Sequence, residues 1–554
     1  MIKSNNESNR INDRFVNRAA FILYLILNIT LTVFHEPWYD EAESWLIARD
    51  ASWYDIILIR PHFEGHPPLW HLILAMPAKL GLPYEASIKT IQFIFAFAMV
   101  YLIIFCSPFH KYIRRFLPFT FFFLYQYGVI ARPYALFCSA MFMTAMFWNR
   151  RDERPWRVII SMMILCMSSA YGIVIAGGMT SVWVFESLQN ERSSFYRNHR
   201  RLAAWSALFV LAIMLIVEIL PADETYAVIF RNIAIRHGFL WMFLFFWLVV
   251  PSETVITSCS TYACIFEQDL DILSFAATSL VSVLIWLVLI GICKRRKQTL
   301  LLLVPYFLLS IIAASRYFIV HHYGLILAFY ISVMWICADC RPISITSVDE
   351  WMGRSFPQAS VSVRRLLAAG SKLLIVLLIG INVFWSVVSF YNEIRFNYSS
   401  SRTLARFILD NDLQGYRWLG AWRILRDADD PQKILLEDAG EANLESVEVN
   451  PYLGGNLVYN SPSHVSYVTH IVTSPGETRS IIDGLKEEPE PDFILSPTSD
   501  FPQIEKQLDL SADYTQFAYS YSSRIWKGDP FPRYPDYVYI RHGLSERLGL
   551  YGVD

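Results

Sequence analysis

Long apolar segments recur along the first two-thirds of the chain, and they constrain its fold more than any other feature. All but the shortest run for roughly 15 to 22 residues, close to the length of α-helix that crosses the hydrocarbon core of a bilayer. The 554-residue sequence is 54% hydrophobic and only 17% charged, which excludes a single soluble domain. We therefore predict an α-helical polytopic membrane protein with about eleven transmembrane helices. The predicted segments are 19–34, 88–107, 116–130, 134–149, 158–170, 172–186, 202–220, 272–293, 300–315, 318–338 and 373–390.

Basic residues gather in alternate loops between these segments, and this asymmetry predicts the topology. Lys and Arg cluster in residues 1–18 and in the loops after the second, fourth, sixth, eighth and tenth segments. Loops on the cytoplasmic side of a membrane carry this excess. The rule places the N-terminus in the cytoplasm, and it puts loop 35–86 and the chain after residue 390 on the outer side. The first segment is followed by WYDEAE instead of a small-residue cleavage site, so we expect it to remain as an anchor.

The apolar stretch 238–251 does not fit this alternation. The loop after it, 252–271, carries several acidic residues, Glu253 among them, and no Lys or Arg. We expect the stretch to be interfacial or re-entrant on the outer side, with Glu253 in an outer loop.

The composition changes near Tyr391 to that of a soluble domain. Such a change, with predicted strands and helices in alternation, favours a small α/β domain. We therefore divide the chain into a cytoplasmic N-terminus at 1–18, a transmembrane domain at 19–390 whose first outer loop is 35–86, and an extracytoplasmic domain at 391–554. The predicted strands are 434–440, 466–473, 492–497, 514–521 and 537–543, and the predicted helices are 401–412, 476–488 and 501–510.

Two adjacent carboxylates, Asp40 and Glu41, follow the first apolar segment in the stretch FHEPWYDEAESWLIARD. Charged side chains are costly near hydrocarbon, so a pair kept at the membrane boundary indicates function. A second polar cluster, FEGHPPLWH at 63–71, lies in the same loop. Acid, histidine and aromatic side chains at the boundary of lipid and water suit a substrate with an apolar tail and a polar head. The alternative is that the two carboxylates are part of an ordinary solvated acidic surface with no function of their own.

Further polar residues fall on the same predicted outer side. Arg132 lies in the turn ARPYAL between the third and fourth segments, where Pro133 starts the next helix. Arg316 begins the stretch RYFIVHHYG between the ninth and tenth segments. The candidate substrate-binding set is completed by Arg60, Glu64, His66, His321 and His322.

These residues meet the demands of glycosyl transfer from a lipid phosphate. The acceptor hydroxyl must lose a proton as it attacks the anomeric carbon, which calls for a carboxylate base, and the departing phosphate needs cations. We assign the base to Asp40, with Glu41 positioning it or binding a cation. Arg132 and Arg316 are the predicted phosphate clamps, because a guanidinium pairs with two phosphate oxygens and keeps its charge. Both arginines can instead be topology anchors at helix ends.

The motifs DEAESW, HPPL and ARPYAL, with the apolar spans and the outer C-terminal domain, resemble those of the GT-C glycosyltransferases. Within that superfamily, the chain most resembles the bacterial branch related to protein O-mannosyltransferases and aminoarabinose (lipid A) transferases. The resemblance in the arrangement of spans and loops covers residues 15–390. It implies an inverting glycosyltransferase of a bacterial inner membrane, with a polyprenyl-phosphate sugar as donor and Asp40 as the base. The implied acceptor is a hydroxyl group of a cell-surface glycan, a lipid or a protein on the outer side.

One motif departs from that family. Aminoarabinose transferases carry a Glu-Lys-Pro-Pro element whose Glu helps to hold a metal, whereas this chain has Gly65-His66-Pro67-Pro68, with Glu64 one residue earlier. His66 can ligate a metal, bond to phosphate or fix the loop. The sequence therefore leaves a divalent metal open.

Two other classes of protein compete with an enzyme. A transporter or flippase of lipid-linked sugars would carry charged residues near the bilayer midplane, whereas here the polar residues gather at the outer rim. A non-enzymatic membrane scaffold would not bring Asp40, His66, Arg132 and Arg316 together. The near balance of 47 basic and 49 acidic residues gives no reason to expect a nucleic-acid partner. We expect the C-terminal domain to bind the acceptor or stabilise the fold, and nothing in its sequence looks catalytic.

Overall fold

The computed structural model describes residues 2–190, 198–222, 225, 238–256, 272–315, 318, 320–339, 360–426, 433–442, 444–461, 466–522 and 534–549. The chain divides into two compact units. The helical unit comprises Met1–Val33, Gln92–Val217 and Arg231–Phe390, and the mixed unit comprises Phe34–Ile91, Glu218–Phe230 and Tyr391–Asp554. The first outer loop predicted at 35–86 thus packs in one unit with the C-terminal part of the chain.

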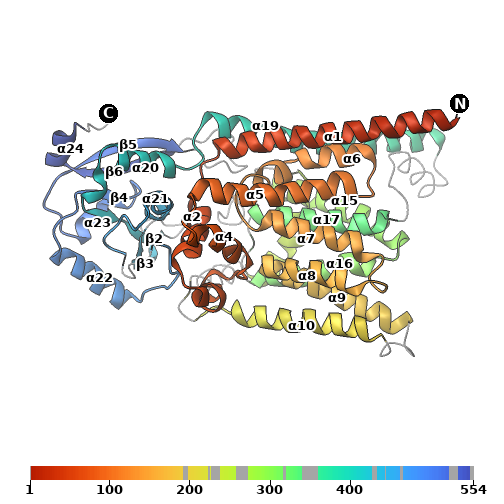
Figure 1. Cartoon of the computed structure of the whole chain (residues 1–554), viewed down its shortest axis with the longest axis horizontal. Helices are drawn as coiled ribbons and strands as arrows, with labels where there is room; N and C mark the ends of the chain where they lie inside the picture. Colours follow the sequence, from red (N-terminus) through yellow and green to blue (C-terminus); the bar gives the residue numbers. More distant parts are fainter. Residues whose placement is uncertain are drawn as a thin grey trace. The chain divides into compact units, whose positions relative to one another are not determined.

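The helical unit is built from apolar helices that lie side by side (Figure 1). Among the described residues, seven helical stretches are long and apolar enough to cross a membrane, and four shorter apolar helices accompany them. This confirms the predicted mostly helical, multi-pass membrane protein, while the count of eleven stays a prediction. The apolar helices are α1 (Ile2–Phe34), α5 (Tyr84–Tyr101), α7 (Tyr134–Trp148), α8 (Pro155–Ser168), α9 (Ala170–Asn190), α10 (His199–Glu218), α12 (Phe239–Leu248), α13 (Val250–Ile256), α15 (Ile272–Arg295), α16 (Thr299–Ser315), α17 (Tyr323–Ala338) and α19 (Val361–Arg395).

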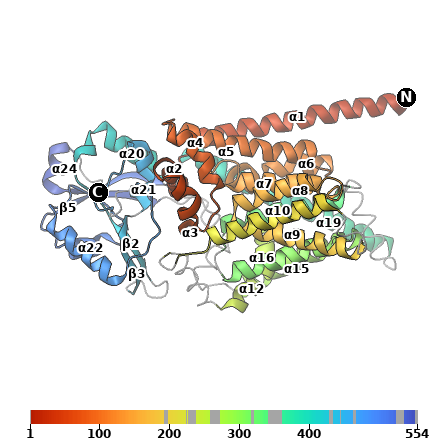
Figure 2. The ribbon, with the colours of Figure 1, turned by 60° about the horizontal axis from the view of Figure 1, so that its bottom comes forward.

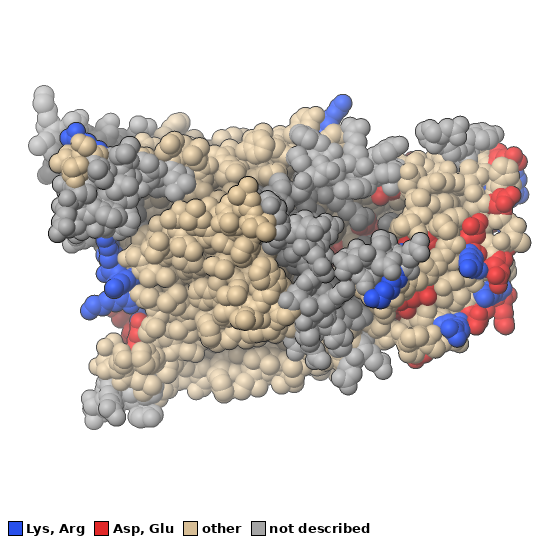
Figure 3. Space-filling view, turned by 180° about the vertical axis from the view of Figure 1, so that it is seen from behind, with Lys and Arg blue, Asp and Glu red and all other residues tan. Residues whose placement is uncertain are grey.

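The surface of the helical unit is largely apolar. Large side chains of α10 and α15, such as Phe209, Ile213 and Leu287, are exposed. Figure 3 shows a broad uncharged surface over this unit, with Lys and Arg side chains gathered at one end. An apolar surface of this extent, bounded by basic residues, suits contact with lipid.

The segment 116–130, predicted as one span, is not a continuous helix. It follows α6 (Lys111–Phe116) as a 3₁₀ turn, η3 (Leu117–Phe119), and a π-helical turn, η4 (Phe122–Gln126). Pro118 has no amide hydrogen to donate, so the helix cannot continue through it unbroken. The prediction of a regular span here was wrong because hydropathy does not report such breaks.

Polar side chains from neighbouring helices satisfy the carbonyl groups of this irregular segment. In an apolar bundle, backbone groups that leave the helical pattern need such partners. Three side chains supply them: Tyr24 donates to Phe123 O (2.8 Å), Asn28 to Gly128 O (2.9 Å) and Gln92 to Tyr127 O (2.7 Å).

The stretch 238–251, predicted as interfacial or re-entrant, belongs to the consecutive helices α12 and α13. Together they span Phe239–Ile256, which is long enough to cross a membrane. α12 lies beside α15 in Figure 2. Three contacts join the two helices to α15: Trp241 with Phe275 (5.4 Å between rings), the indole of Trp286 with Trp247 O (3.1 Å), and Ser252 N with Ser282 Oγ (3.0 Å). The interfacial or re-entrant placement stays a prediction.

Glu253 corrects the sequence prediction for the following loop. It was expected in an outer loop, but it lies on α13 and is only 1% exposed. The helix continues past the last apolar residue of the stretch, and it carries this carboxylate into the bundle.

The mixed unit contains a four-stranded sheet and a separate two-stranded hairpin. The sheet has the strand order β1-β4-β6-β5, with β1 (Trp418–Gly420) parallel to β4 (Phe493–Leu495) and the other pairs antiparallel. Four of the five predicted strands match β3, β4, β5 and β6, whereas 466–473 is not a strand. The remaining elements are β2 (Trp422–Arg426), β3 (Ile434–Ala442), β5 (Tyr514–Ser522), β6 (Tyr534–Arg541), α20 (Ser401–Asp410), α21 (Leu444–Leu453), α22 (Pro475–Glu487), α23 (Phe501–Gln507) and α24 (His542–Leu548).

The first outer loop folds into short helices within the same unit. These are α2 (Tyr39–Asp50), η1 (Asp55–Ile59), α3 (Arg60–Glu64) and α4 (Leu69–Lys79). α2 packs against α21 in Figure 1, and apolar side chains from both helices share a small core. That core comprises Tyr39, Leu46, Val447 and Val468, with Trp38 and Tyr467 beside them. Burial of these side chains fixes α2 against segment 466–470.

Candidate functional site

The predicted acid pair lies in the first turn of α2. Trp38 is extended, and its backbone N donates to Glu41 Oε2 (3.1 Å), so the helix begins immediately after it. Carboxylates are favourable in this first turn because they face the positive end of the helix dipole. Asp40 is partly exposed, whereas Glu41 is only 1% exposed. The two adjacent carboxylates therefore have different environments.

Glu41 pairs with a buried histidine that the sequence analysis did not single out. His35 Nε2 lies 3.0 Å from Glu41 Oε2, and His35 Nδ1 lies 2.8 Å from Glu393 Oε1. Burial alone would lower the pKa of His35, but the two carboxylates raise it to about 10. Glu41 is thus an ion-pair partner of His35, and it is not a member of the cluster described next.

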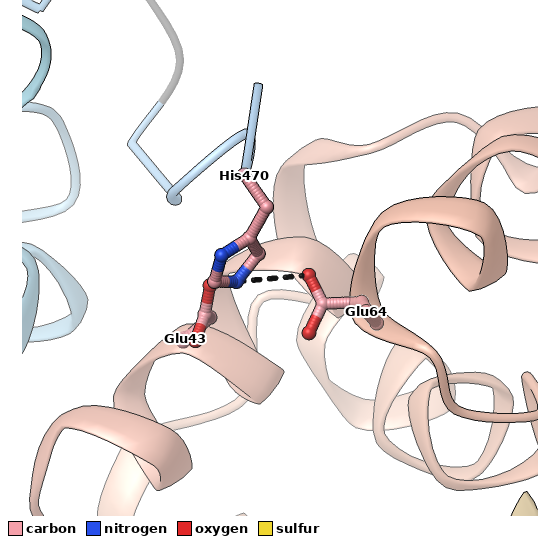
Figure 4. Close-up of side chains that lie close together, drawn as sticks. All are labelled: Glu43, Glu64 and His470. Atoms are coloured by element: carbon pink, nitrogen blue, oxygen red, sulfur yellow. Dashed lines mark ion pairs between the residues drawn. The ribbon is translucent and has the colours of Figure 1, made fainter. Parts of the chain in front are cut away.

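A cluster of two carboxylates and one imidazole lies close to Asp40 in the mixed unit. It is formed by Glu43, one turn along α2, by Glu64, the last residue of α3, and by His470 (Figure 4). One ligand atom of each residue lies within 4.8 Å of the others. His470 Nε2 is 2.8 Å from Glu43 Oε1 and 3.4 Å from Glu64 Oε1. We call Glu43, Glu64 and His470 the acidic cluster.

The two carboxylates of the acidic cluster have opposite electrostatic shifts. Burial raises the pKa of Glu43, and the charges of Glu64 and Asp40 add to this effect, while His470 opposes it. Burial would raise the pKa of Glu64 too, but the surrounding cationic groups, His470 and Arg60 foremost, lower it below its usual value. Pairs of acids with opposite shifts are typical of functional sites.

Arg60 is the counter-ion that holds the acidic cluster together. Its side chain is buried, and its Nη2 lies 3.3 Å from Glu64 Oε1 and 2.6 Å from the carbonyl oxygen of Thr469. It also packs over the rings of Phe63 and Tyr467. Arg60 was predicted to bind substrate, and in this geometry it links α3 to the segment that carries His470.

Two residues of the acidic cluster depend on left-handed backbone conformations. Gly65 has φ +66° and ends α3, so Glu64 is presented at the helix terminus. His470 has φ +59°, which residues with a β-carbon rarely adopt. Strained backbone persists where the surrounding contacts impose it and is concentrated at functional sites.

The acidic cluster fits a divalent cation. Zn²⁺ takes imidazole nitrogen and carboxylate oxygen ligands at about 2.0 to 2.2 Å, which separates neighbouring ligand atoms by roughly 3.4 Å. The separation of 3.4 Å between His470 and Glu64 matches that spacing, whereas the 2.8 Å contact between His470 and Glu43 would lengthen by about 0.6 Å. Mn²⁺ accepts the same ligand types. Glu43, Glu64 and His470 are therefore a candidate ligand set for the divalent metal that the sequence left open.

Glu64 was among the residues predicted from the sequence, whereas Glu43 and His470 were not. Glu43 had a weak signal, since it lies in the DEAE stretch and shares a helix face with Asp40. His470 had none, because 466–473 resembled a strand and the C-terminal part was expected to hold nothing catalytic. His66 is half-buried in the turn after α3, and its charge contributes to the lowered pKa of Glu64.

The other predicted residues lie in the helical unit. The Arg132 guanidinium lies 5.8 Å from the centre of the Tyr134 ring, and the same ring contacts His321 and His322 at 5.9 and 5.8 Å. The two histidine rings are 4.1 Å apart, and both side chains are buried. Arg132 and the two histidines are thus brought together around Tyr134. Arg316 lies outside the described residues.

Comparison of the chain with protein-family models and with curated proteins found no match.

Proposed function

We propose that this protein is an inverting glycosyltransferase that moves a sugar from a polyprenyl-phosphate donor to an acceptor hydroxyl at the outer face of a bacterial inner membrane. One observation carries the proposal: Asp40 is partly exposed in the first turn of α2, six residues after the apolar helix α1 ends at Phe34. Its neighbours Glu41 and Glu43 are buried in ion pairs with His35 and His470. Among Asp40, Glu41 and Glu43, the first is therefore best placed to meet a substrate.

The proposed reaction needs one base and a stabilised leaving group. Asp40 accepts the proton of the acceptor hydroxyl while its oxygen bonds to the anomeric carbon. The bond from the anomeric carbon to the donor phosphate oxygen breaks, and the electron pair leaves with the polyprenyl phosphate. Attack from the face opposite the leaving group inverts the anomeric centre.

The acidic cluster is the proposed metal centre of this enzyme. Glu43, Glu64 and neutral His470 would hold a divalent cation in the same unit as Asp40. Such a cation supplies positive charge that stabilises phosphate oxygens. The protein's own contribution is to hold the three ligand groups and to balance them with Arg60.

Arg132 and Arg316 remain the proposed clamps for the donor phosphate, with His321 and His322 among the proposed substrate-binding residues. A guanidinium pairs with two phosphate oxygens, and an imidazole N–H donates to one. The shared contacts of Arg132 and the two histidines around Tyr134 support a common role in the helical unit. The acceptor class, whether glycan, lipid or protein, stays open.

The test combines lipid analysis with transfer in vesicles. Mass spectrometry of lipids that purify with the wild-type protein should find a polyprenyl-phosphate sugar. In reconstituted vesicles supplied with that donor, Asp40→Asn should reduce transfer by at least about 10²-fold, since loss of a general base typically costs that much. Undiminished turnover by D40N would overturn the proposal.

A second candidate function, movement of lipid-linked sugars across the membrane, is favoured by Glu253. This carboxylate is buried on α13, next to Ser252, whose N–H bonds to the middle of α15. Ionisable groups inside a helix bundle mark transport pathways in many membrane proteins. If transport is the function, Glu253→Gln should stop the movement of the lipid-linked sugar in vesicles while D40N leaves it intact.

A further inference from the structure

We propose that His35 is a positioning residue for Asp40, acting as a fixed bridge between Glu41 and Glu393; this inference rests on the proposed glycosyltransferase function. His35 does not belong to the acidic cluster, and the proposed reaction gives it no chemical step. Its place in the fold nevertheless controls where α2 begins.

The bridge joins three parts of the mixed unit. His35 directly follows α1, Glu41 lies in the first turn of α2, and Glu393 lies near the end of α19. The two nitrogen–oxygen distances are 3.0 and 2.8 Å, and the side chains involved are at most 1% exposed. Both ring nitrogens are used, one for each carboxylate. Only the protonated imidazole can donate from both nitrogens at once.

The backbone between His35 and Asp40 is held at three residues, His35, Pro37 and Tyr39. The donors and acceptors come from α5, α20, α21 and the segment between α19 and α20. The contacts are Lys89 Nζ and Arg402 Nη2 with His35 O (2.7 and 3.0 Å), Ser399 Oγ and Ser401 Oγ with Pro37 O (2.8 Å each), and Glu448 Oε1 with Tyr39 N (2.9 Å). A backbone with this many partners has one conformation rather than several.

The contacts of the segment from His35 to Glu41 fix the position of Asp40. Tyr39 N is fixed by Glu448 on one side of Asp40, and Glu41 is fixed by His35 on the other. Since a base must lie within hydrogen-bond reach of the proton it removes, the direction of this first turn decides whether Asp40 is in range. A displacement of about 1 Å at such a group can reduce the rate by about 10²-fold.

The charged groups around position 35 explain why a histidine, and not another residue, can bridge the two carboxylates. His35 faces Glu41 on α2, Glu393 on α19 and the ring of Tyr398, while Lys89 and Arg402 bond to its carbonyl oxygen. A glutamine in its place has one amide group, and it cannot donate to two carboxylates on opposite sides. One buried carboxylate would then lose its compensating charge.

The test uses His35→Gln in the full-length protein, with His542→Gln as the matched control on the exposed side of α24. In the monodisperse fraction of H35Q, we expect kcat to fall by about 10- to 100-fold while the donor KM is unchanged. Hydrogen–deuterium exchange should increase in peptides covering 36–45 and stay constant in α22. H542Q should match the wild type in all three measurements.

A role confined to overall stability predicts something different. It predicts a lower melting temperature with wild-type kcat for the folded fraction, and that result would overturn the proposal. If H35Q does not fold, Glu393→Gln removes one side of the bridge instead. The same changes in kcat and in hydrogen–deuterium exchange are then expected of E393Q. If the wild-type protein transfers no sugar, the proposed function fails by itself, and unchanged exchange in 36–45 would then overturn the bridge independently.

Discussion

Nε2 of His470 lies 2.8 Å from Oε1 of Glu43, so a residue from the C-terminal part of the chain enters the acidic cluster that follows the first apolar helix. Glu64 joins them from the end of α3, at 3.4 Å from the same nitrogen. Three distant segments of the sequence therefore meet in one unit. A cation at this point would tie the first outer loop to the C-terminal part of the chain, and it would require His470 to be neutral.

Removal of the His470 side chain should weaken metal binding. His470→Gly deletes the imidazole and accepts the positive φ without strain, so the loop keeps its path. After purification and dialysis against Zn²⁺ or Mn²⁺, we expect about one ion per wild-type chain and at least tenfold weaker binding by H470G and Glu64→Gln. Elemental mass spectrometry and titration calorimetry measure both quantities. Equal metal content in wild type and H470G would contradict the assignment.

The buried ion pair of Glu41 should matter for stability. Glu41→Gln removes one of the two carboxylates that compensate His35 and leaves a buried cation with a single partner. Breaking a buried pair by removing one partner typically costs about 3 kcal/mol or more of the free energy of unfolding. Glu546→Gln breaks an exposed histidine pair of the same type at 3.5 Å and is the matched control, with almost no expected effect. Comparable losses in the two variants, measured by chemical denaturation in detergent, would refute this expectation.

The parts of the fold that depend on local pattern could be predicted from the sequence. Long apolar runs predicted the long helices, and runs of residues typical of strands predicted β3, β4, β5 and β6. Proline at 118 was a local signal for a break, but the path of the chain after it could not be predicted, because side chains such as Asn28 stabilise it from elsewhere in the bundle. Hydropathy measures only the apolar content of such a segment.

The site was predicted only in part, for the same reason. Asp40, Glu41 and Glu64 stand out because charge is unusual beside an apolar span. His35 and His470 acquire their roles through contacts with Glu393, Glu43 and Glu64, and nothing within a few residues of either histidine reports those contacts. Long-range pairing decides the function of both residues.

Glu36 should make stability depend on pH. Burial raises its pKa to about 7, although Arg402 and the N–H groups of Arg402 and Thr403 at the start of α20 favour its charged form. The folded state therefore binds a proton more tightly than the unfolded state, whose carboxyl pKa is about 4.3. It follows that stability falls as pH rises from about 4.3 to about 7, by up to roughly 3 kcal/mol.

Glu36→Gln isolates this contribution. The amide oxygen still accepts from α20, but it does not titrate, so the variant should lack this fall in stability between pH 5 and 7. The raised pKa of His35 also makes stability depend on pH, since it stabilises the folded state most below pH 6.5 and progressively less toward pH 10. Both proteins contain His35, so its contribution cancels when the stability of E36Q is subtracted from that of the wild type. Parallel pH profiles of the melting temperature for wild type and E36Q would exclude the assignment.

Two adjacent glycines on α9 provide a matched pair for helix packing in the helical unit. Small residues let neighbouring helices approach closely, and the structure shows such an approach at Gly178. A Cβ on Gly178 would lie 2.7 Å from Pro305 Cα on α16, whereas a Cβ on Gly177 would meet no atom of the described residues within 4 Å. Gly178→Ala should therefore push α9 from α16 and destabilise the protein by about 1 to 3 kcal/mol. Gly177→Ala should be neutral, or stabilising by up to about 1 kcal/mol, because alanine favours the helix. Thermal unfolding of both variants in detergent measures the difference, and equal melting temperatures would show that α9 and α16 are not in contact at Gly178.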